Sequence, residues 1–191
     1  DEKKEDEKKE DEAKPADTAL DAKINELYTA CDGFEWTPKS DADYGKMADV
    51  ARYVTEAKLL ADDDVKKQAA TEAADKVLTR LAEFEWDKTE NIEPLNKYSA
   101  AAGPKKDGGM FFAGIVKGQV NFNEKPGLMV QIEGSEKFAL VMADKVSEIT
   151  PGSRWLILGQ YETDQTLGFK TDGGVNGTAV VVRSKVLVTL D

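Results

Sequence analysis

The sequence contains no histidine and a single cysteine, Cys31, among its 191 residues. These scarcities exclude several kinds of functional site together. A Ser-His-Asp triad, a Cys-His dyad and a histidine-ligated metal centre each need a residue that this chain does not have. A Cys/His zinc site and an internal disulfide are excluded for the same reason. Acid–base chemistry would have to use carboxylates, lysine or tyrosine, and we expect no cofactor.

Long hydrophobic runs and basic segments are also missing. No run of apolar residues approaches the roughly 18–20 that span a bilayer, so we expect no transmembrane segment. The formal net charge is −11. Residues 105–191 carry ten acids and ten bases, whereas the segments before them are acidic. Nucleic acid is therefore the less favoured partner, because its binding normally needs a basic surface.

The first 17 residues, DEKKEDEKKEDEAKPAD, form a charged repeat with no apolar side chain larger than alanine or proline. Such a segment cannot bury enough surface to offset the entropy lost on ordering, so we predict a disordered spacer over residues 1–17. A hydrophilic stalk behind a removed export signal has this composition. We therefore expect an exported protein of the bacterial periplasm or cell envelope, and a lipid anchor upstream of the chain would be consistent with the stalk.

Residues 18–102 have the apolar spacing of amphipathic helices, which predicts a small helical bundle. Ser40 is the expected N-cap of the second helix. A third helix is expected to start at Asp62 or Asp63, and a short fourth to run from Pro94 to Ala101. The apolar stripes of the first two helices consist of Leu20, Ile24, Leu27, Tyr28 and Cys31, and of Tyr44, Met47, Ala51 and Val54.

Two of the three tryptophans end the same tripeptide, Phe-Glu-Trp, at residues 34–36 and 84–86. We interpret each copy as the end of an amphipathic helix that its tryptophan closes. An aromatic pair that grips a ligand is the alternative. When the two copies are aligned, Cys31 takes the position of Leu81, which predicts that Cys31 is a buried apolar residue rather than a nucleophile. Alignment of the copies matches Ile24 with Ala74, Leu27 with Val77, Tyr28 with Leu78, Cys31 with Leu81, and Phe34 with Phe84.

Residues 103–109 contain turn-forming glycines and a proline, and we expect them to link the helices to a β domain over residues 110–191. In that domain the apolar period changes to two, which is typical of strands. The stretch 163–177 is expected to be a turn. The five predicted strands cover residues 110–120, 128–134, 137–144, 153–162 and 178–191.

The first predicted strand contains two glycines, Gly114 and Gly118. They interrupt an even-numbered face on which we expect Phe112, Val116 and Val120 to lie together. Glycines at such positions permit the sharp coil that closes a small barrel.

The segments FFAGIVKGQV, ITPGSRWLILGQYE and GTAVVVRSKVLVTL carry a resemblance to a known family. With them, residues 110–191 resemble an OB-fold and are most similar to the tRNA_anti-like group of OB domains, which occurs in bacterial exported proteins and lipoproteins. The resemblance implies a five-stranded OB-like β-barrel over these residues, and together with the helical bundle predicted before it we expect an α+β protein. The helix usual between the third and fourth strands would have to fit within residues 143–152. An SH3-like barrel is the alternative topology.

OB domains commonly bind oligonucleotides or oligosaccharides across the second and third strands and nearby loops. An ordinary solvated sheet face is the alternative interpretation of the same positions. We predict a non-enzymatic, exported binding or interaction module with a protein or oligosaccharide partner. An oligonucleotide-binding protein is the second hypothesis, and a carboxylate- or lysine-dependent enzyme is the third. The candidate ligand-binding residues are Lys117, Gln119, Gln131, Arg154, Tyr161, Arg183 and Lys185.

Overall fold

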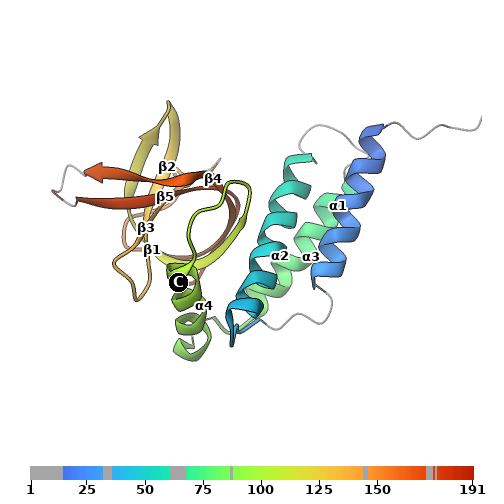
Figure 1. The fold of residues 1–191 in the computed structure, drawn as a ribbon, viewed down its shortest axis with the longest axis horizontal. Coiled ribbons are helices and arrows are strands. Elements are labelled where there is room, and N and C mark those ends of the chain that lie inside the picture. The colour runs from blue at the N-terminus through green and yellow to red at the C-terminus, as the bar shows by residue number, and fades with distance from the viewer. Residues whose placement is uncertain are drawn as a thin grey trace, which may run out of the picture.

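The computed structural model describes residues 15–31, 36–60, 68–86, 88–143, 146–170, 174 and 176–191. Within them, four helices precede a closed five-stranded sheet, which confirms the α+β class (Figure 1). None of these helices is long and apolar enough to cross a membrane. The elements are α1 (Pro15–Cys31), α2 (Asp41–Leu60), α3 (Gln68–Glu83), α4 (Thr89–Ala101), β1 (Gly109–Phe122), β2 (Lys125–Ile132), β3 (Phe138–Met142), β4 (Arg154–Lys170) and β5 (Asn176–Thr189).

Helix α2 begins where the sequence predicts, and its cap shows why. Ser40 Oγ accepts a hydrogen bond from the backbone N–H of Asp43 at 3.2 Å and donates one to the Asp43 carboxylate at 2.9 Å. That carboxylate also accepts from the backbone N–H of Lys39 at 3.1 Å. The two side chains thus satisfy backbone donors that would be unpaired at a helix N-terminus. The predicted stripe is buried: Tyr44, Met47, Ala51 and Val54.

Three predictions about the helical part fall wholly or partly outside the described residues. These are the disorder of residues 1–14, the start of the third helix at Asp62 or Asp63, and the burial of the Cys31 side chain. The last residues of the predicted spacer, 15–17, form the first turn of α1.

The prediction that the fourth helix starts at Pro94 is wrong. Helix α4 begins at Thr89 and contains Pro94. A proline near the N-terminal end of a helix removes a single backbone hydrogen bond. The burial of Ile92 and Leu95 on the same helix explains why the helix forms despite this loss.

The tripeptide at residues 84–86 closes α3, as predicted. The indole Nε1 of Trp86 donates a hydrogen bond of 2.7 Å to the Leu81 carbonyl in the last turn of α3. The Trp86 side chain is 2% exposed, and its ring centroid lies 4.6 Å from that of Phe84 and 5.5 Å from that of Phe111 in β1. Trp36 is half-buried, with its ring centroid 6.4 Å from that of Phe84. Trp86 therefore joins a helix end to the barrel, and its burial excludes it as a ligand grip.

The strands close in the order β1-β2-β3-β5-β4, with β4 pairing again with β1. Every pairing is antiparallel except that of β3 with β5. This order, with its single parallel pair, is that of a five-stranded Greek-key OB barrel. The sheet therefore has an OB-like fold.

The connection from β3 to β4 closes the barrel interior without a helix in its described residues, 146–153. Val146 and Ile149 of this connection are buried in the barrel core. The amide of Gln119 in β1 donates to both of their backbone carbonyls, at 3.0 and 3.3 Å. Two buried side chains and one amide from β1 thus hold the loop in the place where the resemblance implied a helix.

The prediction of a turn over residues 163–177 is wrong for its first half. Strand β4 continues to Lys170 and pairs with β5 as far as Asn176. A register shift between Tyr161 and Thr166 takes up the residues that do not fit the ladder. The two strands consequently project from the barrel as a hairpin (Figure 1), which we call the β4–β5 arm and define as residues 163–170 and 176–180.

The helices share a hydrophobic core with the outer face of β1 and β4. Phe111 and Leu156 of these strands belong to the same buried cluster as Met47 of α2, and β2 and β3 contribute no residue to it. The contact with α2 is very close, since a Cβ on Gly109 would lie 1.6 Å from the carbonyl oxygen of Ala48. The helices therefore cover β1 and β4, and the outer face of β2 and β3 is open.

Candidate ligand-binding groove

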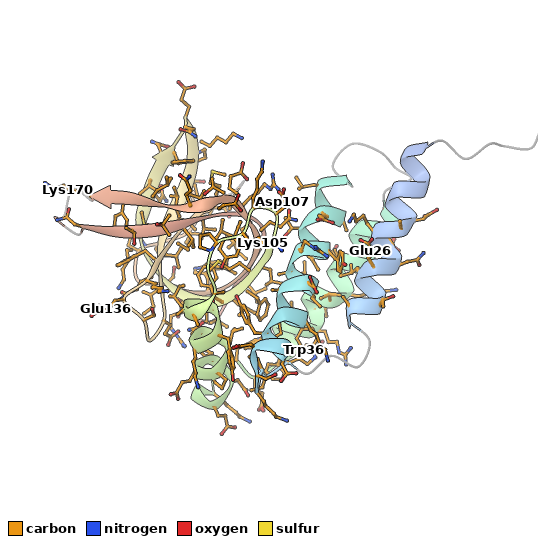
Figure 2. All side chains as sticks on the ribbon, in the orientation of Figure 1. Glu26, Trp36, Lys105, Asp107, Glu136 and Lys170 are labelled. Carbon is orange, nitrogen blue, oxygen red and sulfur yellow. The ribbon has the colours of Figure 1, made fainter. Side chains whose placement is uncertain are left out.

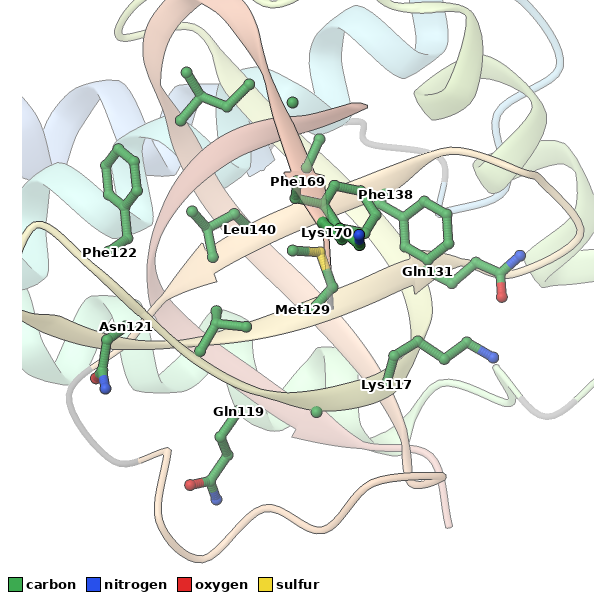
Figure 3. Close-up of a pocket in the computed structure, with 15 residues that line it drawn as sticks. Lys117, Gln119, Asn121, Phe122, Met129, Gln131, Phe138, Leu140, Phe169 and Lys170 are labelled. Atoms are coloured by element: carbon green, nitrogen blue, oxygen red, sulfur yellow. The ribbon is translucent and has the colours of Figure 1, made fainter. Parts of the chain in front are cut away.

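A groove of about 1030 Å³ crosses the open outer face of the barrel. All five strands contribute to it, and Figure 3 shows Met129, Phe138, Leu140 and Phe169 grouped around its floor. We call it the β2–β3 groove. Its lining residues are Lys117–Phe122 of β1, Met129 and Gln131 of β2, Phe138 and Leu140 of β3, Leu167–Lys170 of β4, and Ala179 of β5.

The strand registers explain the apolar floor. Met129 lies opposite Gly118 on one side and Leu140 on the other, and Leu140 lies opposite Val181. Side chains alternate between the two faces of a strand, so the residues between these positions point into the barrel. Strands β2 and β3 are thus apolar on both faces. The inward residues are Leu128, Val130, Ile132, Ala139 and Val141, and a second outward row consists of Gln131, Phe138, Ala179 and Leu167.

A bulge in β1 turns Val120 towards the groove. The prediction that Phe112, Val116 and Val120 share one face is wrong, because Phe112 and Val116 lie in the barrel core whereas Val120 packs with the groove residues. Between Val116 and Gly118, β1 contains one residue that has no partner in β2. An extra residue in one strand reverses the alternation that follows it. The bulge therefore adds the end of β1 to the groove wall.

Three half-buried phenylalanines line the groove: Phe122, Phe138 and Phe169. The rings of Phe138 and Phe169 meet edge to face, with centroids 5.0 Å apart. Gly177 lies opposite Phe169 on β5, and a Cβ there would be 3.0 Å from the Phe169 ring. Glycine at this position thus leaves room for the ring to lie across the arm. Half-buried rings on an open face retain surface that a ligand can contact.

The charge of the groove differs from that of the whole chain. Among the residues that the structure describes, Lys117 and Lys170 are the charged ones that line it, and both are exposed. No carboxylate is among these described lining residues, although the chain has a net charge of −11. Lys170 lies on the β4–β5 arm, at the opposite side of the molecule from Glu26 of α1 (Figure 2). These positions make the groove a favourable place for an anionic ligand.

Three of the seven predicted ligand residues lie at the groove: Lys117, Gln119 and Gln131. Both glutamines have structural partners. Gln119 holds the β3–β4 connection, as described above, and points away from the phenylalanines in Figure 3. The amide of Gln131 donates to the Ser135 carbonyl at 2.8 Å, in the turn after β2. Of the three, Lys117 is the residue best placed to meet a ligand.

Two predicted residues, Arg154 and Arg183, do not line the groove and form ion pairs elsewhere. Arg154 makes a two-pronged contact with the Glu133 carboxylate at 3.0–3.2 Å. Arg183 lies 3.5 Å from the Asp107 carboxylate and 3.4 Å from that of Glu162. These arginines stabilise the barrel and its junction with the helices, because their charges are already neutralised by neighbouring acids.

The prediction that Tyr161 faces a ligand is wrong. Its side chain is 3% exposed and belongs to the barrel core. Burial raises the pKa of its hydroxyl well above the ordinary value. Tyr161 lies four residues after Ile157 in β4 and therefore on the same, inward face of the strand. Its polar hydroxyl was the reason for predicting an exposed position. The side chain of Lys185 lies outside the described residues.

The apolar residues of the groove were missed because the sequence search favoured polar and basic positions. A signal for them is present in β2 and β3. Leu128-Met129-Val130 and Phe138–Met142 are continuous apolar runs, whereas a strand with one solvated face alternates. Residues 166–170, Thr-Leu-Gly-Phe-Lys, also alternate in the manner of a strand. Among the described residues, no three acids or cysteines gather into a group that could hold a metal ion.

Comparisons with known proteins found solved structures of low similarity. No protein-family model and no curated protein matches the sequence. Among solved structures, the chain is similar to Rim1, the mitochondrial single-stranded DNA binding protein of S. cerevisiae, at 13% identity and a TM-score of 0.30, covering 44% of this chain and 94% of that one. It is also similar to OBody NL8, solved bound to hen egg-white lysozyme, at 15% identity and a TM-score of 0.29, covering 44% and 93%. The strand order of the chain itself carries the OB-like assignment.

Proposed function

We propose that this protein is a non-enzymatic binding module whose ligand occupies the β2–β3 groove. The groove itself carries the proposal: its described residues form an apolar floor with three half-buried phenylalanines and two lysines, and include no carboxylate. An apolar surface that a protein leaves uncovered commonly marks a binding site. The outer face of the second and third strands is also where OB folds generally bind their ligands. Membership of the tRNA_anti-like group is part of this proposal and is supported by the rhythm of the strands.

The composition of the groove favours binding over catalysis. A carboxylate-dependent enzyme needs at least one acid beside the reacting atoms and usually two. The described residues that line the groove include none, and two acids beside predicted site residues, Glu133 and Glu162, are in ion pairs with arginines. The third hypothesis, an enzyme, therefore receives no support from this site.

An oligonucleotide is the second candidate ligand. The three phenylalanines could stack on bases, and Lys117 and Lys170 could contact phosphates. Against it, two lysines neutralise few phosphates, and the acidic surface elsewhere repels the rest of a polyanion.

The test is an NMR titration of the isotope-labelled protein with three probes in turn. They are a thymidine dodecamer, cellohexaose and a heptapeptide in which acidic residues alternate with apolar ones. We expect the chemical shifts that change with one of them to concentrate at the groove residues. The variant Phe138→Ala should weaken that binding roughly tenfold, about the effect of losing one aromatic contact. Tyr53→Ala, which removes a half-buried ring from α2, is the matched control and should leave binding unchanged.

Two results would contradict the proposal. One is that a probe binds but perturbs the helices rather than the groove. The other is that none of the three chemical classes perturbs the groove residues at millimolar concentration, because a groove of this size and composition would then have no ligand among the classes that fit it.

A further inference from the structure

The β4–β5 arm presents an unpaired strand edge beside the groove. The ladder between β4 and β1 ends at Gln160, and the backbone of Tyr161 still bonds to Asp107 and Gly108. Beyond Tyr161, within the described part of the chain, β4 has a strand partner only on the β5 side. Its other side leaves backbone N–H and C=O groups of residues 166–170 without a neighbouring strand.

Residues 166–169 of this edge lack the features that usually protect an exposed strand, and the one charge of the edge, Lys170, lies at its end. Natural edge strands carry prolines, bulges or charges that discourage pairing with another chain. Residues 166–169, Thr-Leu-Gly-Phe, contain neither a proline nor a charge, and the register shift lies before them. A Cβ on Gly168 would meet no atom within 4 Å, so the strand is also uncrowded there.

We propose that an extended acidic peptide binds this protein by adding a strand to the edge of residues 166–170. The inference rests on the proposed function and assigns the class of ligand. A polypeptide supplies the alternating main-chain donors and acceptors that a strand edge requires, whereas a nucleic acid or an oligosaccharide does not. Alternate side chains of the added strand would lie beside Leu167 and Phe169, on the apolar floor of the groove.

Charge complementarity indicates why the peptide is acidic. In an added strand, the residue beside Lys170 can form a cross-strand pair with it, and opposite charges there are favourable. Lys117, on the β1 wall of the same groove, attracts a second acid. No carboxylate among the described lining residues opposes these contacts. A peptide with a few acids also meets less repulsion from the acidic chain than a polyanion with a phosphate at every nucleotide.

The probe is an acetylated, amidated heptapeptide in which glutamate alternates with valine and phenylalanine. Its analogue with lysine for glutamate and the thymidine dodecamer are compared with it at equal ionic strength. We expect the acidic peptide to bind at least about tenfold more tightly than the lysine analogue, because reversing several charges beside Lys117 and Lys170 replaces attraction by repulsion. Amide hydrogen exchange should slow at residues 166–170 when the peptide is bound, since strand addition protects the edge.

A charge-reversal pair of variants completes the test. Lys170→Glu should weaken binding of the acidic peptide about fivefold or more. Lys76→Glu, at an exposed position of α3 and with the same change in net charge, should leave it unchanged. Equal effects of the two variants would mean that only the overall charge matters, which overturns the placement.

The outcomes separate this inference from the proposed function. If the dodecamer or cellohexaose perturbs the groove and the acidic peptide does not, the groove is a binding site and the peptide assignment is wrong. If the acidic peptide binds in the groove without slowing exchange at residues 166–170, strand addition is wrong. If no probe reaches the groove, both proposals are overturned.

Discussion

Trp86 and Phe138 are both large aromatic residues at the outer face of the barrel sheet, Trp86 from the segment after α3 and Phe138 from β3. They differ in whether the helices cover them. Trp86 packs against Phe111 of β1 under the helices and is 2% exposed. Phe138 projects from β3 on the face that the helices leave open, and it is half-buried. The same kind of side chain stabilises the fold on the covered face and offers a contact surface on the open one. The cover, and not the residue type, decides between the two roles.

The covered face depends on an unusually close approach of backbones. Gly109→Ala would place a Cβ 1.6 Å from the carbonyl oxygen of Ala48. This oxygen belongs to the backbone of α2, so the clash can be relieved only if the helix moves. We expect this substitution to lower the free energy of unfolding by about 4 kcal/mol or more, above the roughly 1–3 kcal/mol that overpacking usually costs, because the blocking atom belongs to the backbone. Urea unfolding followed by circular dichroism measures it.

The matched control is Gly118→Ala in the groove half of the same strand. A Cβ there meets no atom within 4 Å, so the expected change is within about 0.5 kcal/mol. Similar losses for the two variants would show that β1 is equally constrained along its length, and the comparison of covered and open faces would fail.

Trp86→Ala is expected to have the second largest effect. It empties a buried aromatic site and removes the hydrogen bond from Nε1 to the Leu81 carbonyl, so we expect a loss of about 3–5 kcal/mol. Trp86→Phe, which keeps most of the packing, should cost less. Trp36→Ala should also cost less, because Trp36 is half-buried. Thermal unfolding of the three variants checks this order, and a Trp36 variant less stable than the Trp86 variant would contradict it.

Phe138→Ala sharpens the comparison from the open side. Because the ring is half-buried and its main partner is Phe169, we expect a loss of about 1–2 kcal/mol, well below that of Trp86→Ala. The same unfolding experiment measures it. A loss as large as that of the Trp86 variant would mean that Phe138 belongs to a core and that the groove is not a free surface.

The two faces also differ in how far the sequence predicts them. The covered face follows from periodic signals: the stripe of α2, its Ser40 cap and the closure by Trp86 all appear where the sequence predicts them. Each depends on neighbours within a few residues in the chain, and local chemistry is readable in a sequence. The contact of Gly109 with Ala48 is not readable, because it joins residues that only the folded chain brings together.

The open face was predicted less well because it depends on register. One extra residue in β1 turns Val120 outward, and a longer shift in β4 creates the arm that carries Phe169. A sequence period of two gives the alternation of a strand but not the point at which a bulge reverses it. Tyr161 was misplaced for another reason: it keeps the alternation of Ile157, which faces the barrel core, and its hydroxyl alone favoured an exposed position.

The smallest expected effect concerns the cap of α2, the helix whose backbone touches Gly109. Hydrogen bonds from the Ser40 hydroxyl and then from the Lys39 backbone N–H lower the pKa of the Asp43 carboxyl. A carboxylate whose pKa is lower in the folded state stabilises the protein above its unfolded pKa, and this contribution disappears as the pH falls through the folded value. Asp43→Asn should therefore be less stable than the native protein at neutral pH.

The difference between the native protein and Asp43→Asn should shrink as the pH falls below the ordinary carboxyl range, because the carboxyl of the native protein takes up its proton only there. Urea midpoints at pH 7, 5 and 3 follow it. In a Ser40→Ala background the same substitution should matter less at pH 7, because the hydrogen bond that contributes most to the low pKa is gone. A gap as large at pH 3 as at pH 7, or one that is unchanged by Ser40→Ala, would show that Asp43 acts on α2 through something other than this cap. Binding at the β2–β3 groove should not change in either variant, since the cap lies on the helix that covers the opposite face.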